Sequence, residues 1–192
     1  MGVTTTNLAM GPATVNVGAF GATEPADTAI AMAADPPTPD YTNVGGTMGG
    51  VTITITQQWK EFEVDQIVEV PERRVTRREI AAKTQLAEVT LDNLILALAS
   101  GTKTTGTSGA PDTFEPSNTD SGASPNYKSV ILDGAGAGGR KRRVIIRKVL
   151  STENVDIASS KDSQQSYPVT FTGHYVSPSI KSYKILQIPP AA

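Results

Sequence analysis

The chain has 192 residues, contains no cysteine, and carries 17 Lys and Arg against 19 Asp and Glu. The lack of cysteine excludes disulfides, thiol catalysis and zinc–thiolate sites, and the balanced charge argues against a nucleic-acid binder that depends on neutralising phosphates. Only 38% of the residues are hydrophobic, while 17 are Gly and 13 are Pro, so we expect a chain with long irregular connections that gains part of its burial from neighbouring subunits.

The N-terminal part predicts an arm, a strand and a long connection. Residues 1–13 are small and polar without periodicity, which is typical of an arm. In Thr14–Phe20 apolar residues alternate with small or polar ones, which predicts the first strand. Residues 21–43 are rich in Pro, Ala and Asp, and we interpret them as a long irregular loop that is either solvated or docked on a neighbouring copy.

The segment 46–101 has the strongest pattern in the chain. Between positions 51 and 56 apolar residues alternate with threonines, so the threonines share one face of a strand. Between positions 61 and 70 apolar residues alternate in the same way with carboxylates. The apolar members of this second run are Phe62, Val64, Val68 and Val70, and the carboxylates are Glu61, Glu63, Asp65 and Glu69. We therefore predict an antiparallel pair that turns around Gln58-Trp59-Lys60 and has one buried and one wet face.

A third strand and a helix are predicted next. Pro71-Glu72-Arg73-Arg74 indicates a hairpin corner, and a strand follows over residues 77–86. Thr90 stands where an N-cap belongs, apolar residues recur at helical spacing from Leu91 to Leu98, and Gly101 follows as a stop. These signals predict one short helix at about 90–100, which must pack on the sheet because it is too short to be stable alone.

The remaining sequence predicts a second long loop and four more strands. Gly, Ser, Thr, Pro and Asp dominate residues 101–127, which predicts an irregular loop that stays mobile unless a partner orders it. Strands are expected at 127–132 and 143–150 around a glycine-rich turn, and again at 167–176 and 182–188. Short strands separated by turn signals are typical of a mainly β fold, here an antiparallel β-sandwich or small barrel with one flanking helix.

The chain resembles the major tail tube protein of long-tailed (siphovirus-type) bacteriophages, of the actinobacterial type. The resemblance lies in the glycine-rich turn, the Thr/Ile strand after it, and the two segments EVDQIVEVPERRVTRREI and LAEVTLDNLILAL. The resemblance covers Val15–Pro25 and Gly49–Leu98. It implies one tail-tube-like domain over 1–192, a hexameric ring, and stacked rings that form the virion tail tube through which the genome is delivered.

The same resemblance implies the partners. They are other copies of the chain, a tape-measure protein inside the tube, and the tail terminator and distal tail proteins at its ends. DNA would pass through the lumen without specific binding, and assembly would take place in the cytoplasm of the bacterial host. Two alternatives are the tube-forming ring protein of a bacterial contractile secretion system and a carbohydrate-binding β-sandwich. The latter lacks its platform of aromatics, since one Trp, five Tyr and four Phe serve the whole chain.

The sequence does not favour an enzyme. Gly134, Gly136 and Gly139 match G-x-G-x-x-G, but the β-branched run that follows predicts a strand, whereas a dinucleotide site needs a helix there. His174 is the only histidine, and no nucleophile elbow is present. Carboxylates that alternate along a strand do not converge on a metal. We expect no catalytic, cofactor or metal site, and no membrane span, because no apolar run approaches ~18 residues.

Two assembly surfaces are predicted instead. The basic cluster Arg140, Lys141, Arg142 and Arg143 is interpreted as an inter-subunit contact with acidic surface, the alternative being a solvated strand end. In a ring that extends the sheet, the wet face would line the channel. The residues predicted to face the lumen are Thr52, Thr54, Thr56, Glu61, Glu63, Asp65 and Glu69. The alternative is that this face is outer surface, or that its carboxylates pair with arginines of a neighbour.

Overall fold

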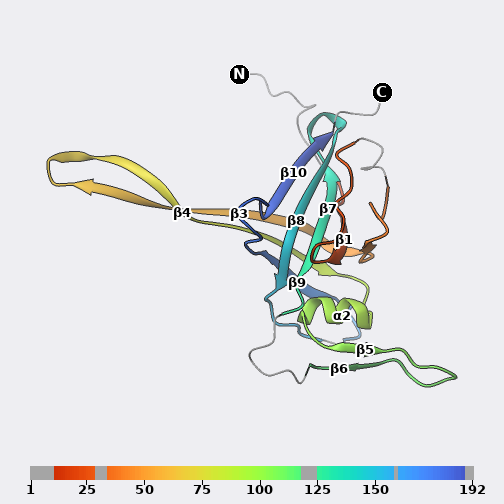
Figure 1. Cartoon of the computed structure of the whole chain (residues 1–192). Coiled ribbons are helices and arrows are strands. Elements are labelled where there is room, and N and C mark those ends of the chain that lie inside the picture. The colour runs from red at the N-terminus through yellow and green to blue at the C-terminus, as the bar shows by residue number, and fades with distance from the viewer. Residues whose placement is uncertain (1–10, 29–33, 118–124, 158–159, 189–192) are drawn as a thin grey trace.

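The computed structural model describes residues 11–28, 34–117, 125–157 and 160–188 (Figure 1). It is a mainly β fold with one short helix, as the sequence predicts. The elements are β1 (Thr14–Ala19), β2 (Tyr41–Asn43), β3 (Thr47–Val64), β4 (Ile67–Leu86), α2 (Leu91–Leu98), β5 (Thr102–Thr104), β6 (Thr113–Glu115), β7 (Lys128–Ala135), the 3₁₀ helix η2 (Ala137–Gly139), β8 (Lys141–Ser151), β9 (Tyr167–Gly173) and β10 (Tyr183–Ile188).

One antiparallel sheet has the order β2-β1-β7-β8-β9-β4-β3, and β10 is an additional partner of β8. Strand β8 is shared by two branches. Its edge opposite β7 pairs with β10 along Lys141–Ile146 and with β9 along Val149–Ser151. The sheet therefore divides at β8, and the β9–β4–β3 branch lies over the β1–β7–β8 part as a second layer. The described strands form a sandwich and do not close into a barrel.

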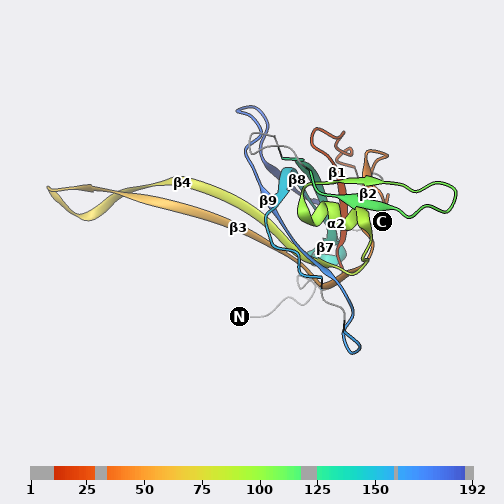
Figure 2. The same cartoon turned by 90° about the horizontal axis from the view of Figure 1, so that it is seen from below.

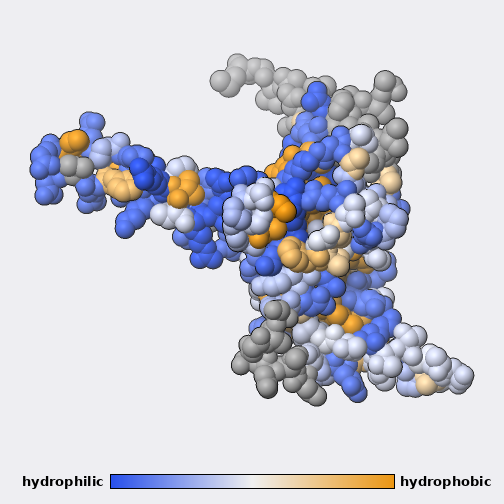
Figure 3. Space-filling model, viewed as in Figure 1, coloured by the Kyte–Doolittle hydropathy of each residue, from blue (hydrophilic) through white to orange (hydrophobic). Residues whose placement is uncertain are grey.

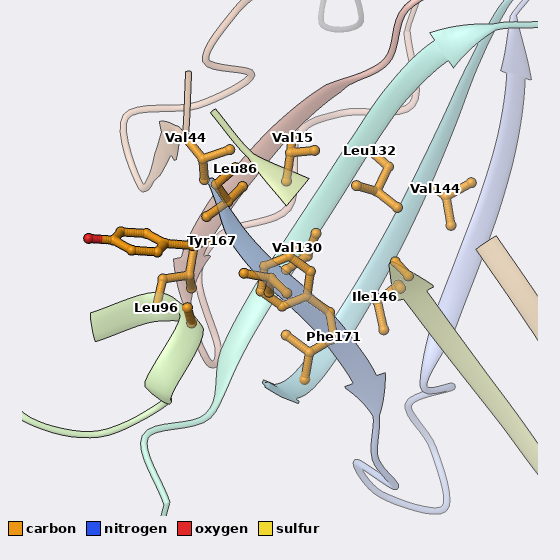
Figure 4. Packing of buried hydrophobic residues seen from close by; sticks show 14 of the residues in the cluster. Val15, Val44, Leu86, Leu96, Val130, Leu132, Val144, Ile146, Tyr167 and Phe171 are labelled. Atoms are coloured by element: carbon orange, nitrogen blue, oxygen red, sulfur yellow. The ribbon is translucent and has the colours of Figure 1, made fainter. Parts of the chain in front are cut away.

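The core lies between these two layers (Figure 4). Alternate residues of each strand point inward, and α2 closes one end. The buried residues of this cluster include Val15, Val130, Leu132, Val144 and Ile146 from one layer, Ile80, Ala82, Leu86, Val169 and Phe171 from the other, and Leu94, Leu96 and Ala97 from the helix. Burial of each large aliphatic side chain contributes about 1.5–3 kcal/mol, so this cluster is the main source of stability. A smaller cluster of Tyr41, Ile131 and Ile145 lies on the opposite face of the first layer.

Helix α2 begins and ends close to its predicted limits. The Thr90 side chain accepts a hydrogen bond from the backbone N–H of Asn93, and Ala99 ends the helix in the left-handed conformation with φ 54°. Buried Asn93 donates from Nδ2 to the backbone oxygens of Val44 (3.0 Å) and Glu88 (2.8 Å). These bonds attach the helix to the chain segments on both sides of the β3–β4 hairpin.

The variant Asn93→Ala is expected to lower the free energy of unfolding by about 1–3 kcal/mol, because it leaves two backbone carbonyls without their donor. Urea denaturation of the monomer, followed by circular dichroism, measures the change. Ser100→Ala, at an exposed position just beyond the same helix, is the control and should stay within about 0.5 kcal/mol of the wild type. Equal stability of both variants would contradict the anchoring role of Asn93.

The predicted division of residues 51–86 into three strands is wrong. Gln58-Trp59-Lys60 lies inside β3, the hairpin turns at Asp65-Gln66, and β4 continues through Pro71. Proline is tolerated there because, among the described strands, β4 pairs with β9 only at 81–86. The edge of β4 that faces away from β3 therefore has no described strand partner at Pro71. The prediction that Phe62, Val68 and Val70 are buried is also wrong for the single subunit, since all three side chains are exposed. The side chain of Val64 lies outside the described residues.

Short strands also occur in the two segments predicted as irregular loops. Strand β2 ends the first loop by pairing with β1. Strands β5 and β6 form a separate hairpin in the second loop, where Phe114 packs against the main core. The Lys103 ammonium lies 2.7 Å from the Asp92 carboxylate and ties this hairpin to α2. Residues 29–33 and 118–124 of these loops, and most of the predicted N-terminal arm, lie outside the described residues.

Candidate assembly interface

The outer part of the β3–β4 hairpin projects far from the body of the molecule, and we call residues 56–78 the arm (Figures 1 and 2). Every side chain described in it is exposed. Ion pairs between Arg73 and Glu61 (2.6 Å) and between Arg74 and Glu72 (3.2 Å) lie along it, and the Arg74 guanidinium stacks 5.0 Å from the Phe62 ring centroid. Exposed pairs of this kind contribute little to stability, so the ladder between β3 and β4 is what holds the arm together.

The register assigns the residues of the arm to two faces. Cross-strand partners share a face, and successive residues of a strand alternate between faces. Strand β3 is continuous from Thr52 to Phe62, and the residue that shifts the register, Thr76, lies in β4 between the partners of Gln58 and Trp59. Even-numbered positions of β3, including the three threonines, therefore lie on one face, and odd-numbered positions, including Trp59 and Glu61, lie on the other.

This alternation corrects part of the predicted lumen surface. The expectation that Thr52, Thr54 and Thr56 share a face with Glu61 is wrong, because no turn separates the two runs. Glu63, Asp65 and Glu69 lie around the turn at the end of the arm. The predicted set is thus divided between one face of β3, the opposite face, and the end of the hairpin.

The threonine side is the outer face of the β9–β4–β3 layer. Ile53 and Ile55 pair with Ala82 and Ile80, which are buried in the core, so the intervening threonines point away from the core. The pairing of β4 with β9 extends this outer surface to two further threonines. We call the resulting surface the threonine face, and it consists of Thr52, Thr54, Thr56, Thr170 and Thr172.

Charges next to the threonine face are neutralised within the chain. Lys83 lies opposite Thr52 and donates a 2.6 Å hydrogen bond to Glu153. This bond holds the pKa of the Glu153 carboxyl below its usual range. Glu79, opposite Thr56, accepts a 2.7 Å hydrogen bond from Arg77. The outer face is therefore polar but close to electrically neutral.

The arm exposes an unusual amount of apolar surface for a hydrophilic ribbon. In Figure 3 hydrophobic patches interrupt an otherwise hydrophilic projection. Trp59 is 56% exposed and is opposite Val75 on the odd-numbered face. The other large apolar residues exposed on the arm are Phe62, Ile67, Val68 and Val70. An isolated two-stranded ribbon is at best marginally stable in water, and its unpaired edges can accept another chain.

The basic cluster is split by burial. Arg143 is 0% exposed and binds Asp133 with both ends of its guanidinium, from Nε to Oδ1 (2.6 Å) and from Nη2 to Oδ2 (2.5 Å). Arg143 is therefore not part of the exposed surface on which the cluster was predicted. Arg140, Lys141 and Arg142 are exposed at the β7–β8 turn. In this turn the N–H of Gly136 donates to the Arg140 oxygen (2.7 Å) around a short 3₁₀ helix at Ala137–Gly139. Strand β8 follows directly, where a dinucleotide site needs an α-helix, so the glycine pattern forms a hairpin turn.

Arg147 and His174, which adjoin the same sheet, take part in contacts within the chain. Arg147 forms an ion pair with Glu24 and donates from Nη1 to the Lys181 oxygen (2.7 Å), joining three distant segments. The His174 ring packs edge-on against Tyr127 at 5.4 Å. Among the described residues, no group of three or more His, Asp or Glu side chains is placed to hold a metal ion. No helix in the described ranges has the length and apolar character to cross a membrane.

Comparison with known proteins gives one family. A family model described as phage tail tube protein matches residues 5–177. The match includes both long loops, the arm and the β7–β8 turn. A search of curated proteins finds no match for this chain.

Proposed function

The chain belongs to the phage tail tube protein family, and from this premise we propose that its copies close into hexameric rings and that the rings stack into the tube through which the genome leaves the virion. The subunit is a structural component of the virion tail. We further propose that tubes assemble in the host cytoplasm around a tape-measure protein and end at the terminator and distal tail proteins. No catalytic step is required for this role.

The observation that supports self-assembly best is the uncovered arm. It presents Trp59 and several aliphatic side chains to solvent on a ribbon whose two edges pair with no other described strand. Nine residues of strand extend about 30 Å, so the arm is long enough to lie across a neighbouring subunit. Contact with a second copy would bury the apolar side chains and supply partners for the edges. In such a contact the arm of one copy binds a different surface of the next copy. Repeated head-to-tail, contacts of this kind join the copies into a closed ring or a continuing stack.

We propose that the threonine face lines the channel. Its hydroxyl groups are small and uncharged, and the neighbouring charges are paired within the chain. A phosphate backbone therefore meets no fixed row of cations, and DNA slides without adhering. We restrict the lumen proposal to the threonines, because the carboxylates predicted with them lie on the opposite face or at the end of the arm.

Negative-stain images of the purified protein test the proposed function directly. Rings or tubes are the expected result. A particle that remains monomeric at high concentration would contradict it.

Replacing Thr54 and Thr56 with lysine is expected to permit tube assembly but to slow DNA ejection several-fold, because each lysine can bind a phosphate of the passing duplex. The rate of DNA release from virions carrying the variant measures the effect, and raising the salt concentration should reduce it. The control is Thr54→Gln with Thr56→Gln, which has long side chains without charge. If the lysine and glutamine variants eject at the same rate, this face does not contact the DNA.

A further inference from the structure

We propose that the end of the arm docks on the β7–β8 turn of a second copy, so that acidic side chains of one subunit meet basic side chains of the next. This inference rests on the proposed function, since it requires that copies assemble. We call residues 63–70 the acidic tip and residues 136–142 the basic turn. The tip carboxylates are Glu63, Asp65 and Glu69, and the turn cations are Arg140, Lys141 and Arg142.

The acidic tip lacks partners for both its charges and its apolar groups. Within the described part of the chain, none of its three carboxylates has an ion pair, whereas Glu61 and Glu72, just next to it, are paired with arginines of β4. The tip also exposes Ile67 and Val68. Exposed aliphatic side chains do not stabilise a turn that contacts only water. Their presence beside unpaired carboxylates therefore favours a protein surface, rather than an ion or water, as the partner of the acidic tip.

The basic turn is the complementary surface. Several cations of the body are bound to carboxylates of their own chain, as in Lys83–Glu153, Lys103–Asp92, Arg147–Glu24 and Lys184–Asp27. In the described ranges the turn is the one run of three consecutive cations without such a partner. The buried Arg143–Asp133 pair fixes the strands next to the turn. Arg142 Nη2 also donates a hydrogen bond to Gln187 Oε1 (2.9 Å). The charges are therefore presented on a fixed surface.

The acidic tip cannot reach the basic turn of its own chain. Figures 1 and 2 both show the arm extending to one side of the body, while the turn lies at the end of the β7–β8 pair, which belongs to the body. The two charge sets can therefore match only between copies. Each subunit then gives a tip to one neighbour and receives a tip from another, which is the head-to-tail contact that a ring or stack requires.

Charge reversal in both directions tests the contact. One variant carries E63K, D65K and E69K, and a second carries R140E, K141E and R142E. At low salt each alone is expected to assemble about tenfold more slowly than the wild type, because like charges now meet and complementary charge mainly governs association. The combined six-fold variant should recover most of the rate. Light scattering follows assembly, and circular dichroism and gel filtration check that each free subunit is folded.

Mixing the two triple variants gives a sharper test. The positive tip of the first then meets the negative turn of the second, and the negative tip of the second meets the positive turn of the first. Two proteins that assemble poorly alone should therefore form tubes together. The inference would be overturned if either triple variant assembled at the wild-type rate, or if neither the mixture nor the combined variant recovered assembly. Either result would leave the proposed function intact.

The remaining outcomes are also decisive. If the turn variant assembles normally but loses affinity for a DNA duplex, the turn serves nucleic acid and the proposed contact is wrong. If the wild-type protein itself forms neither rings nor tubes, the proposed function fails and the inference fails with it.

Discussion

Removal of the outer arm is expected to abolish tube assembly and to leave the monomer folded. The change replaces residues 61–73 with Asn-Gly, which joins the cross-strand partners Lys60 and Arg74 through a favoured two-residue turn. The deleted side chains that the structure describes are all exposed, so the free energy of unfolding should change by less than about 1 kcal/mol. Assembly fails because the apolar side chains and free edges that a second copy would cover are gone. Electron microscopy and urea denaturation measure the two effects.

The β5–β6 hairpin offers a matched control. In both cartoon views it projects on the side opposite the arm (Figures 1 and 2). Replacing residues 105–112 with Asn-Gly between the partners Thr104 and Thr113 removes a comparable exposed loop that carries no large apolar side chain. This variant should assemble. Normal tubes from the arm-shortened protein, or failure of both variants, would contradict the specific role of the arm.

The variant Arg143→Met is expected to lower the free energy of unfolding by about 3–5 kcal/mol, because it leaves the Asp133 carboxylate partly buried without its cation. Asp133→Asn should have a similar cost for the same reason. Urea denaturation of the monomer at neutral pH measures both.

A double-mutant cycle provides the control for this pair. Replacing both residues together, as R143M with D133L, removes the unpaired charge and should recover much of the loss. Additive effects of the two single changes would indicate that the side chains act independently. A loss below about 1 kcal/mol in each single variant would contradict the buried pairing.

The elements predicted correctly are those whose residues are buried on one face. Strands β7, β8 and β9 were found because apolar residues such as Val130, Ile146 and Phe171 must reach the core. Helix α2 was found because Thr90 caps it, and the cap bond is present. In such segments burial makes the period of the pattern informative.

The arm was divided wrongly for the opposite reason. Both faces of residues 56–78 are exposed in the subunit, so neither face is constrained to be apolar by the fold of one chain. The change from odd-numbered to even-numbered apolar positions between Ile55 and Phe62 was interpreted as a turn, although the strand continues. Where burial comes from another subunit, the pattern reflects a contact that one sequence does not reveal.

Arg143 could not be separated from the exposed basic cluster by sequence alone, because its burial and its ion pair depend on the register between two strands. In the sequence Arg143 looks like its neighbours Arg140 and Arg142. Only the pairing of β7 with β8 places it opposite Asp133, and only the sheet as a whole buries it. The pairing of Glu24 with Arg147 joins segments more than a hundred residues apart and has no local signature.

The uncovered arm has a consequence for the kinetics of tube growth. With the proposed docking, two free subunits that meet would cover one arm and leave another in water, so the first complexes would be poorly stabilised. A subunit that joins an existing ring end would cover its own arm and receive that of a neighbour in one step. Polymerisation should therefore show a lag that seeds shorten, with a critical concentration below which only monomers persist. A pool of free subunits could then wait in the cell until an initiating complex offers the first receptive end.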